Sequence, residues 1–204
     1  MLGKALETLF IRVWVVVKLT LFFWLFSLAG GIVLGIGPAL KTINELFYHY
    51  EFEYKDITLK QGWYCFKKYF KRGNYLFFFF FAGLAILSYN LYLSVQIQGL
   101  LFLGIDFILL FGLLYLFATY QWSLILDSEY EMTFGNVIKL SFISSLSSFS
   151  TLLKMIIGSG IILALTWHFK GLLLFGLLGL LTVWNVLATK KWREELAVRM
   201  ENYE

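Results

Sequence analysis

Long apolar runs with almost no charged positions dominate the hydropathy pattern of this chain. The stretch 73–126 contains one charged side chain, Asp106, and the stretch 140–189 contains only Lys154 and Lys170. Each stretch is long enough for two membrane-crossing helices of about 20 residues joined by a tight turn. The alternation of apolar and polar positions that a membrane barrel requires is absent. The pattern therefore predicts an all-α, polytopic helical membrane protein.

We expect one integral membrane domain over residues 1–204 with about five crossing segments. A cleaved secretory signal is disfavoured, because the first apolar run continues through Leu40 and is longer than a signal core. The run contains Gly35-Ile36-Gly37-Pro38, which predicts a chain break there and a second helix from Pro38 through Leu46. The expected spans are about 13–37, 75–95, 101–125, 152–168 and 171–189.

The basic residues are distributed unevenly and predict an orientation. Segment 41–74 holds seven lysines and arginines, whereas the turn near Gln98 holds none. By the positive-inside rule, segments 41–74, 127–151 and 190–204 face the cytoplasm, which places the protein in the plasma membrane with a cytoplasmic C-terminus. Five spans then leave the N-terminus outside, although Lys4, Arg12 and Lys18 favour the inside. The alternative is a first segment that enters and returns, with its bend at Gly30-Gly31 or Gly35.

Residues 59–72 show the pattern of an amphipathic helix on the cytoplasmic membrane surface. Thr58 is a suitable N-cap, and apolar residues recur at helical spacing beside a face of lysines. The lysines would lie among lipid phosphates. The alternative is a helix packed beneath a neighbour. The side chains that define this predicted surface helix are Trp63, Phe66, Lys67, Lys68, Phe70 and Lys71.

A weak internal repeat also precedes the two long apolar stretches. Asp56-Ile57-Thr58 aligns with Glu131-Met132-Thr133, and each is followed by a surface helix and then a hairpin of spans. Some transporters use such repeats to form a site between two halves. Chance similarity explains the alignment equally well, because any helix start favours an acid and a threonine.

Composition supports the membrane class and removes several others. Of the 204 residues, 60% are apolar and 20% aromatic. The net charge of +4 comes from basic residues outside the apolar runs, without a nucleic-acid-binding motif, so lipid headgroups rather than nucleic acid are the expected partner. Cys65 is the only cysteine, which excludes an internal disulfide and argues against a thiolate metal site.

Polar residues inside the spans are the candidates for a solute path or for helix contacts. Ionisable groups at membrane depth often mark function, and amides and hydroxyls often bond neighbouring helices. The candidate intramembrane residues are Asp106, Asn90, Asn185 and Lys154. A polar face at helical spacing is formed by Ser141, Ser144, Ser145 and Ser148, for which we favour helix packing over a solute track.

No catalytic arrangement is recognisable. His49 and His168 lie on different segments without a carboxylate or thiol at ligand spacing, and the chain has no P-loop, HExxH or G-x-S-x-G motif. We therefore predict no enzyme activity, no cofactor and no metal site.

The residues resemble the YesL family of small bacterial membrane proteins of uncharacterised activity. The resemblance lies in segments 19–28 (LTLFFWLFSL) and 36–39 (IGPA), and in 63–74, which lead into the second span. It implies an accessory of ABC-type oligosaccharide uptake, with permease or ATPase subunits, or a second copy, as partners. The family supplies no catalytic or ligand residues.

Two functions follow as hypotheses. The first is a non-enzymatic accessory or regulator of a carbohydrate importer, acting through the surface helix 59–72 or the serine face 141–148. The alternative is a small-solute transporter with a path between the two helical hairpins and Asp106 at its outer mouth.

Overall fold

The computed structural model describes residues 2–201, and 87% of the chain is helical, with no strand in the described part. The prediction of an all-α fold is confirmed. The helices are α1 (Leu2–Ala29), α2 (Val33–Tyr50), α3 (Leu59–Lys68), α4 (Phe70–Ser94), α5 (Leu100–Glu129), α6 (Phe134–Ser147), α7 (Phe149–His168), α8 (Gly171–Phe175) and α9 (Leu177–Glu201).

Four of the described helices are long and apolar enough to cross a membrane. They are Gly3–Ala29 of α1 and the full lengths of α4, α5 and α7. The fifth predicted span, 171–189, is divided at Gly176 into the short helix α8 and the start of α9. Helix α9 then continues through the charged segment that follows, so residues 190–201 are helical as well. Crossing by this fifth segment stays a prediction.

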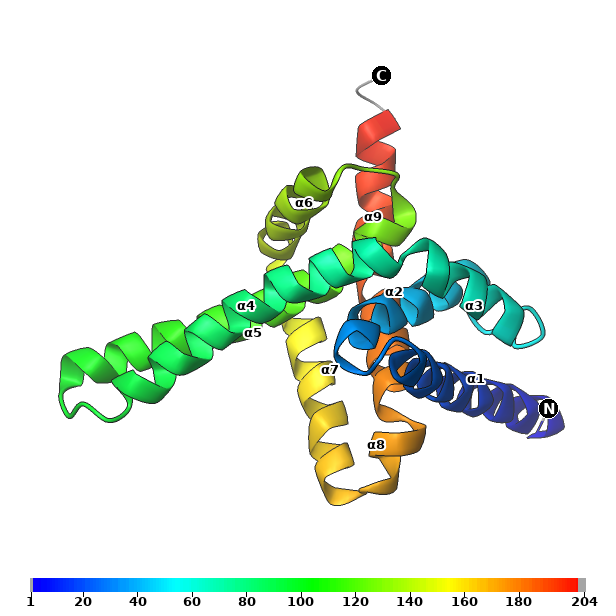
Figure 1. Ribbon diagram of the computed structural model, residues 1–204, viewed down its shortest axis with the longest axis horizontal. Coiled ribbons are helices and arrows are strands. Elements are labelled where there is room, and N and C mark those ends of the chain that lie inside the picture. The colour runs from blue at the N-terminus through cyan, green and yellow to red at the C-terminus, as the bar shows by residue number, and fades with distance from the viewer. Residues whose placement is uncertain (1, 202–204) are drawn as a thin grey trace.

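Two helical hairpins leave the centre of the molecule in different directions (Figure 1). One is formed by α4 and α5, and the other by α7 with α8 and the start of α9. A short helix, α3 or α6, precedes each hairpin, which is the order of elements that the weak repeat predicts. Because the hairpins diverge, at least one of them must tilt away from the membrane normal.

The first apolar run bends earlier than the segment 35–38 suggests. Helix α1 continues to Ala29, the chain turns through Gly31 with φ +78° and Ile32 with φ 61°, and α2 starts at Val33. The predicted break at Pro38 is wrong, because Pro38 lies inside α2, where it removes one backbone hydrogen bond. The bend coincides with the Gly30-Gly31 position of the re-entrant alternative. The side on which α1 begins remains a prediction.

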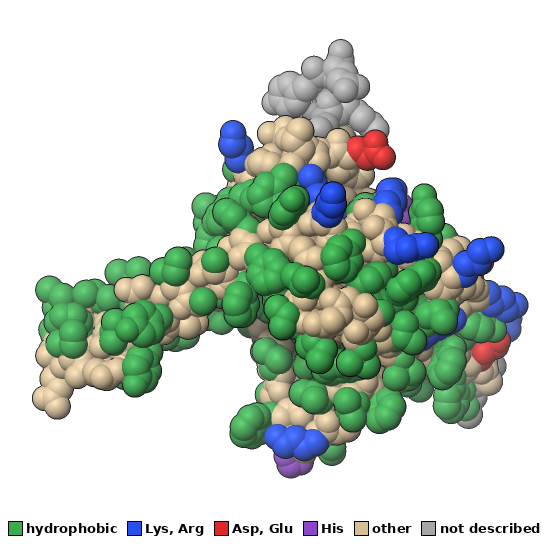
Figure 2. Space-filling view, in the orientation of Figure 1, with side chains coloured by type: hydrophobic (Ala, Val, Ile, Leu, Met, Phe, Trp, Pro, Cys, Tyr) green, Lys and Arg blue, Asp and Glu red, His purple; other side chains and the backbone are tan. Residues whose placement is uncertain are grey.

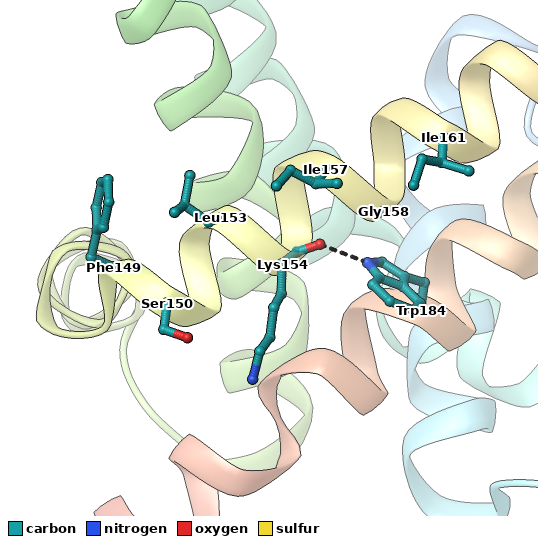
Figure 3. Close-up of a pocket in the computed structure, with 8 residues that line it drawn as sticks. All are labelled: Phe149, Ser150, Leu153, Lys154, Ile157, Gly158, Ile161 and Trp184. Atoms are coloured by element: carbon teal, nitrogen blue, oxygen red, sulfur yellow. Dashed lines mark hydrogen bonds between the residues drawn. The ribbon is translucent and has the colours of Figure 1, made fainter.

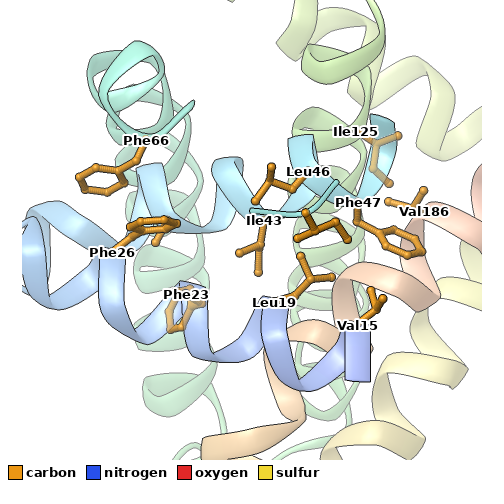
Figure 4. Packing of buried hydrophobic residues seen from close by; sticks show 12 residues of the cluster. Val15, Leu19, Phe23, Phe26, Ile43, Leu46, Phe47, Phe66, Ile125 and Val186 are labelled. Atoms are coloured by element: carbon orange, nitrogen blue, oxygen red, sulfur yellow. The ribbon is translucent and has the colours of Figure 1, made fainter. Parts of the chain in front are cut away.

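Helices α1 and α2 pack antiparallel and contribute most of the central core (Figure 4). Leu19 and Phe26 of α1 are fully buried, as are Ile43 and Phe47 of α2. Phe66 of α3 stacks on Phe26 with ring centroids 5.4 Å apart. The same cluster includes Ile125 of α5 and Val186 of α9, so the core lies where five helices meet.

The α2–α4 crossing depends on two glycines. A Cβ on Gly37 would lie 2.6 Å from the Gly73 carbonyl oxygen, and a Cβ on Gly73 would lie 2.7 Å from the Cα of Pro38. Both distances are too short for a side chain, so the two backbones touch. This contact brings together the Gly37-Pro38 and Gly73 segments that carry the family resemblance.

The predicted surface helix 59–72 is two helices. Thr58 caps α3 in a capping box with Gln61, as the sequence indicates, but Tyr69 leaves the helical conformation and Phe70 and Lys71 belong to α4. One side of α3 is packed beneath its neighbours, since Phe66 is buried. Trp63 remains 42% exposed, and Lys67, Lys68 and Lys71 are exposed.

The outer surface is predominantly apolar over the hairpins (Figure 2). Basic side chains gather mainly toward α3, α6 and α9, with a further basic group at the tip of the α7–α8 turn (Figure 2). This separation agrees with a lipid-facing hairpin surface and a basic end at the headgroups.

Candidate functional site

A lysine and a glutamate lie in the middle of α2, in a stretch where almost every side chain is buried. Lys41 is 0% exposed and Glu45 is 6% exposed. They stand one helical turn apart on α2, which also contributes apolar residues to the core. Buried charges are costly unless each is paired and hydrogen-bonded, so the partners of these two groups define the site.

Lys41 contacts two carboxylates at once. Its Nζ lies 3.0 Å from Glu45 Oε2 and 3.2 Å from Asp127 Oδ2 at the end of α5. The same ammonium donates a hydrogen bond of 2.8 Å to Ser128 Oγ. Lys41 therefore joins α2 to α5 through charge-assisted bonds.

Arg72 binds the other oxygen of Asp127. Its Nε and Nη2 donate to Asp127 Oδ1 over 2.9 Å and 2.6 Å, and Nη2 also donates to the Met132 carbonyl over 2.8 Å. Arg72 is in the first turn of α4 and Asp127 in the last turn of α5. The pair thus closes the base of the α4–α5 hairpin, opposite its turn at 95–99.

Glu45 accepts a further bond from the α3–α4 junction. Tyr69 OH donates to Glu45 Oε1 over 2.8 Å, and His49 Nε2 lies 3.3 Å from the same oxygen. Burial raises the pKa of Glu45, but the Lys41 charge and the hydrogen bonds from Tyr69 and Lys41 outweigh it, so this pKa lies below its usual value. Burial, assisted by Glu45, raises the pKa of Tyr69 to about 12.

The four charges form one network that holds three helices together: Lys41 and Glu45 on α2, Arg72 on α4 and Asp127 on α5. Two cations face two anions, and each charge is bonded to at least one opposite charge. We call this set the ionic network. Its groups are engaged with each other, so the arrangement is suited to fixing helix positions rather than to carrying out proton transfer.

A groove of about 550 Å³ between α2 and α3 adjoins the ionic network. Glu45 and Tyr69 lie on its inner side, and Lys60 and Lys68 are exposed along it. Cys65 also lines the groove, and burial raises the pKa of its thiol. Within residues 2–201 no group of three His, Cys, Asp or Glu side chains is placed to hold a metal ion. The groove can therefore offer cationic, phenolic and amide groups to a polar partner.

A second charged contact joins α5 to α9. Arg193 is 7% exposed, its Nη1 lies 3.2 Å from Glu129 Oε2, and its Nη2 donates to the Val186 carbonyl over 3.2 Å. The last turn of α5 thus carries two acids: Asp127 is bonded to α2 and α4, and Glu129 is bonded to α9. This places the start of the C-terminal charged segment against the network end of the molecule.

Asp106 lies far from this site, in the outer half of the α4–α5 hairpin. It is half-buried, and its Oδ1 is buried without a hydrogen-bond partner in the described part of the chain. The hairpin carries it away from α7–α9 (Figure 1). The structure therefore does not bring Asp106 to the boundary between the two hairpins.

The two candidate asparagines behave differently. Asn185 is 0% exposed and accepts a 3.5 Å hydrogen bond from Ser159 Oγ, which links α9 to α7 as expected for a helix contact. Asn90 is exposed and donates to Ile86 of its own helix. A cross-helix role for Asn90 stays a prediction, because the bond that its amide forms in the described chain is to a carbonyl of its own helix.

Lys154 lies beside Trp184 on an open face between α7 and α9 (Figure 3). Trp184 Nε1 donates to the Lys154 carbonyl over 3.0 Å, while the lysine side chain itself is exposed. Gly158 permits this approach, since a Cβ there would overlap the indole ring. Lys154 and the ionic network are separate features.

The serine face is divided between two helices. Ser141, Ser144 and Ser145 are 0% exposed on α6, which packs mainly on α5. Ser148 ends α6 and caps α7 by accepting from the Thr151 amide over 3.3 Å. The prediction of one continuous helix is wrong, because the Ser148 hydroxyl competes for the backbone. The three buried serines serve helix packing and cannot form an external docking face.

Sequence reasoning missed the whole ionic network. Lys41 and Glu45 lie in a segment whose composition predicts a polar, cytoplasmic region. The sequence therefore does not indicate that these two side chains are buried. A weaker signal existed for Arg72 and Asp127, because they lie 23 residues before and 28 residues after the turn at 95–99, and so near the same end of the hairpin. Opposite charges at matched ends of a helical hairpin predict such a bridge.

The comparisons with known proteins give one match. Residues 16–91 match a family described as "Protein of unknown function, DUF624". The match covers less than half of the chain and includes α2, α3 and three of the ionic-network residues, but not Asp127. It also spans the segments 19–28, 36–39 and 63–74. No curated protein and no solved structure matches the chain.

The lowered pKa of Glu45 predicts an acid-sensitive contribution to stability. The carboxyl group has its ordinary pKa of 4.5 in the unfolded chain and a lower pKa in the folded protein. Its ionised form therefore stabilises the fold fully above pH 4.5. This stabilisation is lost as the pH falls below 4.5 and through the folded-state pKa. The measurement is thermal unfolding of the detergent-solubilised protein at pH 7 and at a pH below 4.5. On this decrease in pH the wild type should lose more thermal stability than the Glu45→Gln variant. Parallel curves for the two proteins would contradict the assignment.

Proposed function

We propose that this protein is a non-enzymatic accessory or regulatory component of ABC-type carbohydrate uptake in the plasma membrane. Its partner would be a permease or ATPase subunit of an oligosaccharide importer, contacted from the cytoplasmic side. The resemblance to the YesL family suggests this role, and the DUF624 match covers the segments that carry the resemblance.

The observation that carries the proposal is the ionic network itself. Its charges, of which only Arg72 is partly exposed, are bonded to one another and fix α2, α4 and α5. Such a network provides a rigid base for a docking surface. The non-enzymatic part of the proposal rests on this structural use of the charges.

Helix α3 supplies the docking surface in this proposal. Its buried side is anchored by Phe66, while Leu59, Trp63 and Tyr64 are exposed next to exposed lysines. Exposed aromatic residues are enriched at protein contacts. The buried serines of α6 leave α3 as the better of the two predicted docking faces.

Purification from native membranes tests the proposal. Tagged wild-type protein should co-elute with permease and ATPase subunits, identified by mass spectrometry, and a Trp63→Ala/Lys67→Glu variant should lose most of them. Lys139→Glu, a charge reversal at an exposed position of α6, should retain them. A clean homo-oligomer, or equal recovery with all three proteins, would contradict the accessory role.

The alternative function is a small-solute transporter. The observation in its favour is the buried, unpartnered Oδ1 of Asp106. A proteoliposome flux assay decides this point, because flux that depends on Asp106 should be lost in Asp106→Asn. Unchanged flux in that variant, or no flux in the wild type, removes the residue-level support.

A further inference from the structure

The face between α7 and α9 carries a groove of about 520 Å³ with an apolar wall and a cation at one end (Figure 3). Leu153, Ile157 and Ile161 form the α7 side, and Trp184 closes the α9 side. From Ser150 to Ile161 the groove follows α7 for about 16 Å at 1.5 Å per residue. That length equals about half of the hydrocarbon thickness of a bilayer, which is the depth of one leaflet.

The charged end of this groove has no anion from the protein. Lys154 is exposed and forms no ion pair with any carboxylate of the described residues. Ser150 stands one turn earlier on the same side of α7 (Figure 3). Helix α7 starts at Phe149, and Ser148 caps only one of its first amides. A lysine, a hydroxyl and a helix start together favour a phosphate group.

We propose that this groove binds one anionic phospholipid, with its phosphate at Lys154 and Ser150 and an acyl chain along Leu153, Ile157 and Ile161. The start of α7 follows the segment 127–151 that the charge distribution predicts to be cytoplasmic. The site would therefore select a lipid of the inner leaflet. Lys154 gives the site its preference for an anionic headgroup. The aliphatic wall binds the acyl chain, and this part of the binding is the same for every headgroup.

Gly158 and Trp184 give the groove its shape. The indole lies directly on Gly158 and is fixed by its hydrogen bond to the Lys154 carbonyl. The same hydrogen bond positions Trp184 against the turn that carries Lys154. The acyl-chain wall and the backbone at Lys154 are thus held in a fixed relation.

Native mass spectrometry of the full chain in detergent tests the site, with phosphatidylglycerol and phosphatidylcholine of identical acyl chains as probes. Wild type should bind phosphatidylglycerol more tightly. Lys154→Gln should weaken phosphatidylglycerol binding about fivefold, the effect of one lysine near an anionic headgroup, and leave phosphatidylcholine binding unchanged. Lys154→Arg should keep the preference, because it keeps the charge.

Two further variants separate the site from general surface attraction. Lys139→Gln removes another exposed lysine, on α6, and should bind both lipids as the wild type does. Ile157→Trp fills the groove and should weaken both lipids. The proposal is overturned if Lys154→Gln keeps the wild-type preference, if Lys139→Gln loses as much of it, or if filling the groove has no effect. Thermal unfolding of each variant checks that it is folded.

Discussion

Replacing Lys41 by methionine should lower the free energy of unfolding by about 3–5 kcal/mol, because removal of one partner leaves buried charge uncompensated. Lys41 is 0% exposed and lies 3.0 Å from Glu45 and 3.2 Å from Asp127. Arg72 can still neutralise Asp127, but Glu45 keeps only the neutral donor Tyr69 and the partly exposed His49. The measurement is the unfolding midpoint in detergent compared with the wild type.

Two controls make this prediction specific to the ionic network. Lys67→Met changes an exposed lysine of α3 and should have little effect. The double variant Lys41→Met/Glu45→Gln removes one charge of each sign and leaves the Arg72–Asp127 pair intact. It should recover a large part of the lost stability. A Lys41→Met protein as stable as Lys67→Met, or a double variant less stable than the single one, would show that Lys41 does not compensate Glu45.

Placing leucine at Gly73 should cost about 2–3 kcal/mol, the upper part of the usual range for overpacking. Even the Cβ would lie 2.7 Å from the Cα of Pro38, a backbone atom that cannot rotate away. Helix α4 would have to separate from α2, and the adjacent Arg72 would move with it. The loss should appear in thermal unfolding of the detergent-solubilised variant.

Gly104→Leu is the matched control for this substitution. Gly104 lies inside α5, and a Cβ there meets no atom within 4 Å. Leucine favours a helix over glycine by about 0.8 kcal/mol, so this variant should be as stable as the wild type or slightly more stable. An equal loss in both variants would mean that the α2–α4 contact is not the cause.

The elements set by local pattern were predictable from the sequence. Helices α4, α5 and α7 follow from long apolar stretches with few charged residues, and Thr58 marks the start of α3. The errors arise where a residue had two possible uses. Gly35 and Gly37 could either bend the chain or allow another backbone to approach closely. They lie inside α2, where Gly37 contacts Gly73. The bend is formed instead by residues Gly30 to Ile32.

The candidate site could not be predicted because it depends on pairing between distant segments. Lys41 meets Asp127 only after α2 packs on the base of the α4–α5 hairpin. Nothing local in the sequence distinguishes Lys41, which is fully buried, from Lys67, which is exposed. The apolar stretches indicate where the helices lie. The charged residues of the ionic network can be recognised as helix contacts only when the packing of the helices is known.

Labelling of single cysteines in intact cells tests most directly whether the chain crosses the membrane with its basic segment inside. In a Cys65→Ser background, Lys67→Cys places a thiol on α3, and Gln98→Cys places one at the turn of the α4–α5 hairpin. A membrane-impermeant maleimide should label position 98 in intact cells and position 67 only after permeabilisation. Labelling of position 67 from outside, with position 98 protected, would contradict the account.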